Sequence, residues 1–121
     1  TDIIIIGAGP CGLFTVFEAG LLKLRCHLID ALPQAGGQLT EIYPKKPIYD
    51  IPGFPEVLAG ELVENLMNQA APFKPGFTLG ERAESFEKTE DGKHDAQSNY
   101  LHWKLQCGQE NQRAYEGVQL T

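Results

Sequence analysis

The stretch IIIIGAGPCG, residues 3–12, predicts a β-strand followed at once by a G-x-G-x-x-G turn. Four consecutive β-branched residues are typical of a parallel strand that is buried on both faces. From Gly12 to about Leu22 apolar residues recur at helical spacing, and residues 25–29 predict a second strand that Asp30 closes. Strand, glycine turn, helix and strand together predict a right-handed βαβ unit.

Each glycine of this turn has its own physical role. Gly7 permits a tight turn, Gly9 lets the main chain approach a pyrophosphate, and Gly12 lets the helix pack close to the sheet. The pyrophosphate is expected at the helix N-terminus, where unpaired N–H groups and the helix dipole favour an anion.

An acidic residue ends the second predicted strand. Asp30 lies 18 residues after Gly12, where a carboxylate accepts hydrogen bonds from ribose hydroxyls and repels a 2′-phosphate. The site is therefore expected to hold FAD or NAD and to disfavour NADP. Glycine turns also arise for structural reasons alone, but here the strand, the helix and the acid all fall where dinucleotide binding needs them.

The remaining chain divides into a loop, a helix and short strands. Residues 31–59 combine many prolines and glycines with apolar side chains, which predicts a long, ordered, functional loop. An amphipathic helix is predicted over residues 60–71, ended by Pro72. A strand is predicted at residues 77–79, and a three-strand antiparallel meander at residues 83–88, 100–107 and 115–120. Residues 89–99 are expected to form an exposed, mobile hairpin tip.

These elements define the expected fold class. It is α/β, a Rossmann-like FAD/NAD(P)-binding fold that starts with a parallel sheet and continues into the antiparallel three-strand meander.

Bulk properties exclude several classes of protein. A chain of 121 residues allows one domain at most, and a formal charge of −6, from 16 acidic and 10 basic residues, would repel nucleic acid. No run approaches the roughly 20 apolar residues of a membrane helix, and the start does not resemble a signal peptide. The 3 cysteines contain no Cys-x-x-Cys pair, which argues against a disulfide scaffold, a zinc site or a dithiol centre. We expect a cytoplasmic protein with no membrane or nucleic-acid partner.

Three further motifs are more specific: GGQLT at residues 36–40, YPKK at 43–46 and IYDIPGFP at 48–55. Together with the glycine turn they resemble the thioredoxin-reductase-like ferredoxin (flavodoxin)–NADP reductases of the pyridine nucleotide-disulfide oxidoreductase superfamily. The resemblance runs from about Asp2 to Lys88.

The resemblance implies FAD as the cofactor of this segment. Asp30 would bind the adenosine ribose, Gln38 and Tyr43 the flavin half, and Ala83 would offer its main chain to the adenine. Tyr43 has an alternative role as an aromatic packed under the loop, and Cys11 fits a variable motif position better than a reactive thiol. The expected cofactor-binding residues are Gly7, Gly9, Pro10, Cys11, Gly12, Asp30, Gly37, Gln38, Leu39, Tyr43 and Ala83, with no catalytic residue and no metal ligand.

The resemblance also implies a larger enzyme. Such reductases need a second glycine motif for NADPH and a late Gly-Asp segment, and neither occurs here, so residues 1–121 are expected to be the N-terminal part of an FAD-binding domain. The whole enzyme would pass electrons from NADPH through FAD to ferredoxin or flavodoxin, as a homodimer. Alone, this piece is expected to be inactive and to bind FAD weakly or not at all. Two alternatives stay open: the front piece of a thioredoxin reductase, and a non-enzymatic nucleotide-binding module.

Overall fold

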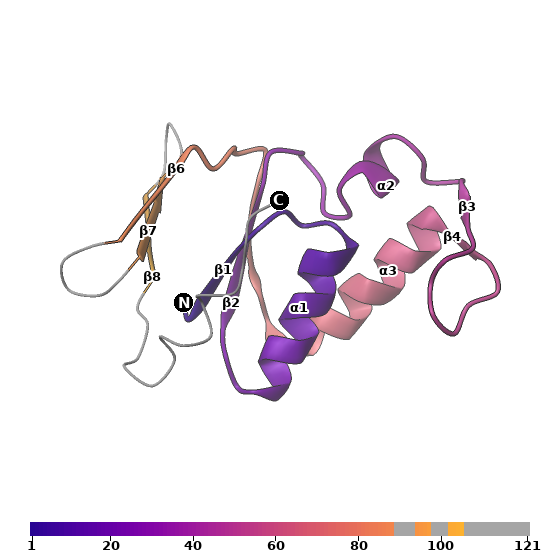
Figure 1. Ribbon diagram of the computed structural model, residues 1–121, viewed down its shortest axis with the longest axis horizontal. Coiled ribbons are helices and arrows are strands. Elements are labelled where there is room, and N and C mark those ends of the chain that lie inside the picture. Colours follow the sequence, from indigo (N-terminus) through magenta and orange to yellow (C-terminus); the bar gives the residue numbers. More distant parts are fainter. Residues whose placement is uncertain (89–93, 98–101, 106–121) are drawn as a thin grey trace.

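The computed structural model describes residues 1–88, 94–97 and 102–105, with side chains described up to residue 85 (Figure 1). The elements in chain order are β1 (Ile3–Ile6), α1 (Pro10–Leu21), β2 (Cys26–Asp30), α2 (Gln38–Glu41), β3 (Pro47–Ile48), β4 (Val57–Leu58), α3 (Ala59–Ala70), the 3-10 helix η1 (Ala71–Phe73), β5 (Gly76–Leu79), β6 (Ser85–Lys88), β7 (His94–Gln97) and β8 (His102–Leu105).

A parallel sheet with strand order β1-β2-β5 forms the centre of the fold. Ile3 pairs with Cys26 in β2, and Leu28 of β2 pairs with Phe77 in β5. The predicted βαβ unit is therefore confirmed. Its boundaries differ slightly from those expected, because α1 begins two residues earlier, at Pro10, whose fixed φ suits the first helical position. Strand β2 runs one residue further, to Asp30.

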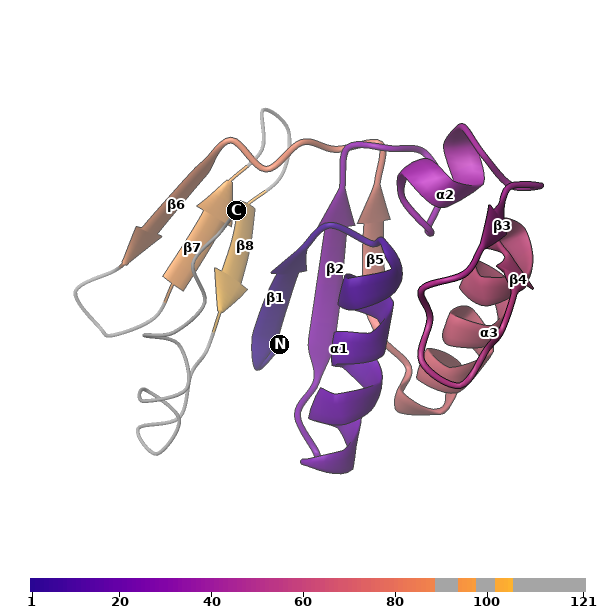
Figure 2. The same ribbon diagram turned by 45° about the vertical axis from the view of Figure 1, so that its right-hand side comes forward.

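The hydrophobic core lies between this sheet and the two helices α1 and α3. Leu13 and Val16 of α1, Leu28 of β2, and Val63 and Ala70 of α3 are buried in one cluster. Both helices lie on the same side of the sheet, and the strands β6, β7 and β8 lie on its other side (Figures 1 and 2). Burial of this apolar stripe, at about 25 cal/mol per Å², provides the main stabilisation of α3.

Helix α3 confirms the amphipathic pattern expected for residues 60–71. Leu62 and Val63 are buried, whereas Glu61 and Glu64 are exposed. The α-helix ends at Ala70, and the chain continues as the 3-10 helix η1, which contains Pro72. Pro72 has no N–H and therefore cannot donate the next α-helical hydrogen bond, which accounts for this ending.

Strand β1 differs from expectation in its burial. Ile3 to Ile5 are half-buried and Ile6 is 45% exposed, although the run of isoleucines predicts a strand buried on both faces. Among the described strands, β1 lies at an edge of the parallel sheet, with β2 as its one neighbour. The expectation is therefore wrong for β1 within the described residues, whereas Leu28 and Ile29 of β2 are fully buried.

The loop of residues 31–59 is ordered and contains helix α2 and the short antiparallel hairpin of β3 and β4. Many of its apolar side chains are exposed in the described part of the chain. They are Ile42, Tyr43, Tyr49, Phe54 and Leu58, each between 44% and 66% exposed. Exposed apolar surface of this kind marks contact sites for other protein or ligand.

The antiparallel meander has the strand order β6-β7-β8. Its middle strand, β7, falls inside the segment expected to be a hairpin tip, so that expectation is wrong for residues 94–97. Ala96 pairs with Phe86 on one side and Trp103 on the other, and this cross-strand pairing overrides the weak β-propensity of a polar segment. The strand expected at residues 115–120 lies outside the described residues.

Within the described part of the chain, no helix is both long and apolar enough to cross a bilayer.

His27 is a half-buried titratable group in β2. Its Nε2 lies 2.7 Å from Oγ1 of Thr78, and a Cβ on Gly76 would collide with its ring. Burial, helped by the N-terminal charge, lowers the pKa of His27 below its ordinary value. The unfolded chain therefore binds an extra proton below about pH 6.5, and folding loses stability as the pH falls through this range.

We predict that the free energy of unfolding decreases from pH 7 toward pH 5, by at most about 1.4 kcal/mol per pH unit from this residue. In His27→Gln this component of the pH dependence disappears, whereas the pH dependence from other groups remains. Urea unfolding of both proteins at several pH values measures the difference. Parallel pH profiles for the two proteins would contradict the prediction.

Candidate nucleotide-binding site

The glycine turn between β1 and α1 has the geometry that its sequence requires. Gly7 has a φ of +105°, a conformation that side chains rarely adopt. A Cβ on Gly12 would collide with the carbonyl oxygen of Gly7 and lie 3.3 Å from Cγ2 of Ile5. Gly12 therefore allows the start of α1 to pack against the end of β1.

The amino end of α1 is open to a ligand within the described structure. Gly9 is the N-cap residue, no side chain caps the helix, and Pro10 occupies the first turn. A Cβ on Gly9 would have no heavy atom within 4 Å. The first-turn N–H group of Cys11 and the helix dipole can therefore interact with a phosphate, as anions do at helix N-termini.

Asp30 ties the end of β2 to the glycine turn. Its Oδ2 accepts a hydrogen bond of 2.6 Å from the N–H of Ala8, and its Oδ1 accepts one of 2.9 Å from the N–H of Leu32. A carboxylate oxygen has capacity for more than one hydrogen bond, so these contacts leave acceptor positions for ribose hydroxyls.

The main chain of Ala8 also holds the Gly36-Gly37 loop in place. The carbonyl oxygen of Ala8 accepts a hydrogen bond of 2.7 Å from the N–H of Gly36, and Ala8 is fully buried. At Gly37, where φ is +62°, a Cβ would lie 3.3 Å from Cα of Gly9. The loop thus packs closely on the turn that faces the helix N-terminus.

The segment after β5 returns to the end of β2. The N–H of Gly80 donates to the carbonyl oxygen of Leu32 at 2.9 Å, and the N–H of Glu81 donates to that of Asp30 at 3.0 Å. These bonds bring Ala83 close to the carboxyl ends of β1 and β2.

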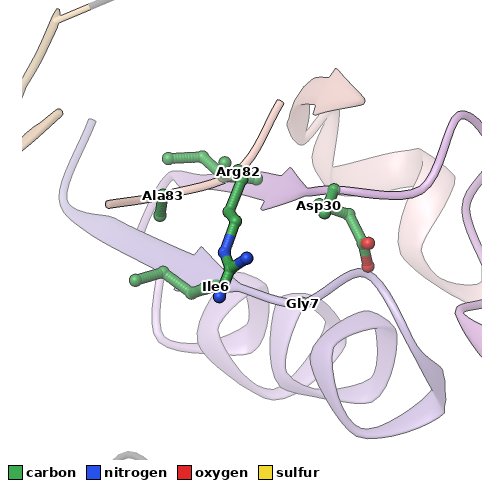
Figure 3. A pocket seen from close by; sticks show the side chains of 7 residues that line it. Ile6, Gly7, Asp30, Arg82 and Ala83 are labelled. Atoms are coloured by element: carbon green, nitrogen blue, oxygen red, sulfur yellow. The ribbon is translucent and has the colours of Figure 1, made fainter. Parts of the chain in front are cut away.

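A cavity of about 260 Å³ lies at this edge of the sheet (Figure 3). Three of the expected cofactor-binding residues line it together: Gly7, Asp30 and Ala83. Its other lining residues are Ile6, Ile29, Ala31 and Arg82. In open α/β sheets, ligands bind outside the carboxyl ends of the strands, which is the position of this cavity.

The residues expected at the flavin half lie on and after α2, apart from this cavity. Gln38, the first residue of α2, is exposed, and Leu39 is half-buried against the core. Tyr43 is 52% exposed, and the ammonium group of Lys46 lies 5.3 Å from the centre of its ring. Tyr43 is therefore not packed under the loop, the alternative considered for it.

The cysteines of the described residues show no sign of a reactive site. Cys11 is exposed in the first turn of α1, and its carbonyl oxygen accepts a hydrogen bond of 2.7 Å from the hydroxyl of Thr15. Cys26 lies inside β2, where burial raises the pKa of its thiol and so disfavours the thiolate. The described residues also contain no group of three metal-ligating side chains.

Sequence reasoning missed three residues of this region: Ala8, Ile6 and Arg82. Ala8 is a variable position of the motif and acts through its main chain, so its side-chain type carries no signal. Ile6 is hidden in an apolar run. Arg82 had one available signal, because it directly precedes Ala83, whose main chain was expected at the adenine.

We predict that Gly12→Ala destabilises the protein by about 1–3 kcal/mol, the usual range for overpacking, because its Cβ would collide with Gly7. Gly9→Ala is the matched control: φ at Gly9 is −75° and the space beside it is open, so its effect on stability should stay within about 0.5 kcal/mol. Thermal unfolding followed by circular dichroism compares them. Equal losses for both variants would refute the packing role of Gly12.

We predict that Asp30→Asn costs about 1–3 kcal/mol, because an amide offers one acceptor oxygen and leaves Ala8 or Leu32 without its hydrogen bond. Asp50→Asn, at an exposed position in the loop, should change stability by less than about 0.5 kcal/mol. Denaturant unfolding measures both. A neutral effect of Asp30→Asn would show that its carboxylate does not hold the glycine turn.

Comparison with known proteins agrees with this geometry. No family model matches the chain. Ferredoxin–NADP reductase 1 of Christiangramia forsetii is 82% identical over 92 residues, covering 76% of this chain and 26% of that protein. The ferredoxin–NADP reductase of Flavobacterium johnsoniae is 75% identical over 99 residues, covering 82% of this chain and 28% of that protein. The thioredoxin reductase of T. acidophilum has a TM-score of 0.73 at 25% identity, covering 86% of this chain and 32% of that chain.

The chain spans about a quarter of the length of the curated relatives it matches. The expected Rossmann-like fold is confirmed. The resemblance to thioredoxin-reductase-like ferredoxin–NADP reductases, which rested on the motifs of residues 7–12 and 36–55, is confirmed as well. Over three quarters of its length, this chain matches ferredoxin–NADP reductases in sequence, and it shares its fold with thioredoxin reductases.

Proposed function

We propose that this chain is the N-terminal FAD-binding segment of a flavoprotein that passes electrons from NADPH through FAD to ferredoxin. The observation that carries the proposal is the cavity at the ends of β1 and β2. It combines the glycine turn, the Asp30 carboxylate and the main chain of Ala83 at one edge of the sheet.

The chemistry of these residues fits the adenosine and pyrophosphate half of FAD. The free N-terminus of α1 suits the pyrophosphate, and the carboxylate of Asp30 suits the ribose hydroxyls. The same carboxylate would repel a 2′-phosphate, so NADPH is expected at a different site of the complete enzyme. Pro10 and Cys11 would lie at the pyrophosphate, and Ala83 at the adenine.

The loop after β2 would supply contacts for the flavin half. Gln38, with its polar end exposed, and Tyr43 are the side chains proposed to contact it, together with Gly37 and Leu39. When bound, FAD supplies hydride acceptance and single-electron transfer. The residues of this chain bind and orient it, and none of them is proposed to be catalytic.

Two observations support the idea that further protein completes the site. The chain spans about a quarter of its curated relatives, and five apolar side chains between residues 42 and 58 are at least 44% exposed in the described structure. We propose that an NADPH-binding domain and a second FAD-binding segment belong to the same protein, and that it is a cytoplasmic homodimer. Flavodoxin is the alternative electron acceptor.

Thioredoxin reductase is a second candidate, supported by the solved structures that share the fold. The far higher identity to proteins named ferredoxin–NADP reductase favours the first proposal. A non-enzymatic nucleotide-binding module differs from both in one simple property, since it would lack flavin absorbance and NADPH oxidation.

We predict that the full-length protein purifies with one FAD per chain and reduces ferredoxin with NADPH. Thioredoxin with a disulfide substrate serves as the competing acceptor in a parallel assay, and flavodoxin as a third. Faster transfer to thioredoxin than to ferredoxin would assign the protein to the second candidate. If the protein has no bound flavin and does not oxidise NADPH, the non-enzymatic nucleotide-binding module is the remaining candidate.

The 121-residue chain by itself should bind FAD weakly or not at all and should not oxidise NADPH, because further protein is proposed to complete the flavin half of the site. Equilibrium dialysis of FAD against the purified chain measures this affinity. Tight, stoichiometric yellow flavin on the isolated chain would overturn the proposal that further protein completes the site.

A further inference from the structure

The side chain of Arg82 lines the cavity at the ends of β1 and β2. It starts from the segment that also carries Ala83 and extends across the cavity toward the end of β1, with Asp30 to one side (Figure 3). Arg82 is exposed, and within the described residues no ion pair or hydrogen bond engages its guanidinium group. Its planar cation is therefore available to a ligand.

The other lining residues define what kind of ligand group would meet this cation. The side chains of Ile6, Ile29, Ala31 and Ala83 are apolar, so most of the lining suits a flat, weakly polar group. Asp30 is the one acidic residue that lines the cavity, and both of its oxygens already accept main-chain hydrogen bonds.

A phosphate is a poor occupant of this cavity. The carboxylate of Asp30 would repel it, and the glycine turn offers an anion a better position at the N-terminus of α1. An aromatic base fits instead, because a guanidinium group is planar, weakly hydrated and attracted to aromatic faces.

We propose that Arg82 is an affinity-determining residue that stacks its guanidinium group on the adenine of the bound dinucleotide. This inference rests on the proposed function, because it takes FAD as the ligand. Ile6 and Ala83 provide the apolar surroundings of the ring, while Asp30 fixes the adjoining ribose.

The proposal is tested by FAD titration of the full-length apoprotein, followed by flavin fluorescence. Arg82→Ala should weaken FAD binding about threefold to thirtyfold, the range expected for a cation on an aromatic face. Arg82→Lys should restore less than half of that loss in free energy, since an ammonium group lacks the planar surface. The matched control is Arg25→Ala, which removes an exposed arginine paired with Asp2 at the other end of β2 and should leave FAD affinity unchanged.

Two further measurements separate stacking from charge attraction. FMN lacks the adenosine, so wild type and Arg82→Ala should bind FMN equally. Wild type should also keep its higher affinity for FAD, relative to Arg82→Ala, when sodium chloride is raised from about 0.05 to about 0.5 M. Stacking is screened by salt less than a long-range charge attraction is.

Each outcome decides between the possibilities. Unchanged FAD affinity in Arg82→Ala overturns the inference and leaves the proposed function intact. The inference is also overturned if Arg82→Lys restores the full FAD affinity and if the affinity difference between wild type and Arg82→Ala vanishes at high salt. That result would assign Arg82 to the pyrophosphate. Failure of the wild-type protein to bind FAD refutes the proposed function, and this inference with it.

Discussion

The main chain of Ala8 is the point on which the whole site depends. Its N–H donates to the carboxylate of Asp30, and its carbonyl oxygen accepts from Gly36. One buried residue thereby joins the end of β2, the glycine turn and the loop that follows. Because a buried polar group without a partner is costly, these two hydrogen bonds fix where both neighbouring segments lie.

Asp30 extends this arrangement through its side-chain carboxylate and its main-chain carbonyl oxygen. The carboxylate holds Ala8 and Leu32, while its main-chain oxygen accepts from Glu81 and so positions the segment that carries Arg82 and Ala83. The proposed adenosine side of the site is thus organised by hydrogen bonds among described residues of this chain. The flavin side differs, because Gln38 and Tyr43 are exposed on a surface with few described neighbours.

The parts of the fold that the sequence predicts well are those set by local pattern. The isoleucine run, the glycine turn and the apolar stripe of α3 depend on short-range spacing, and each appears close to its expected boundaries. The glycine positions and Asp30 follow from the same motif. Gly7, Asp30 and Ala83, three of the expected cofactor-binding residues, meet at one cavity.

The features that sequence reasoning missed depend on tertiary neighbours. Strand β7 forms because β6 and β8 pair with it, which the polar residues 94–97 do not reveal. Ile6 is exposed because β1 lies at an edge of the described sheet. Ala8 acts through its main chain, and Arg82 matters because the return of the chain after β5 brings it to the cavity, a contact between distant segments.

The most direct test of this account is a crystal structure of the full-length protein with FAD. We expect the ribose hydroxyls of the adenosine within hydrogen-bond distance of the Asp30 carboxylate, and the pyrophosphate at the first turn of α1 beside Gly9. An adenosine bound away from the ends of β1 and β2, or a pyrophosphate remote from α1, would contradict it.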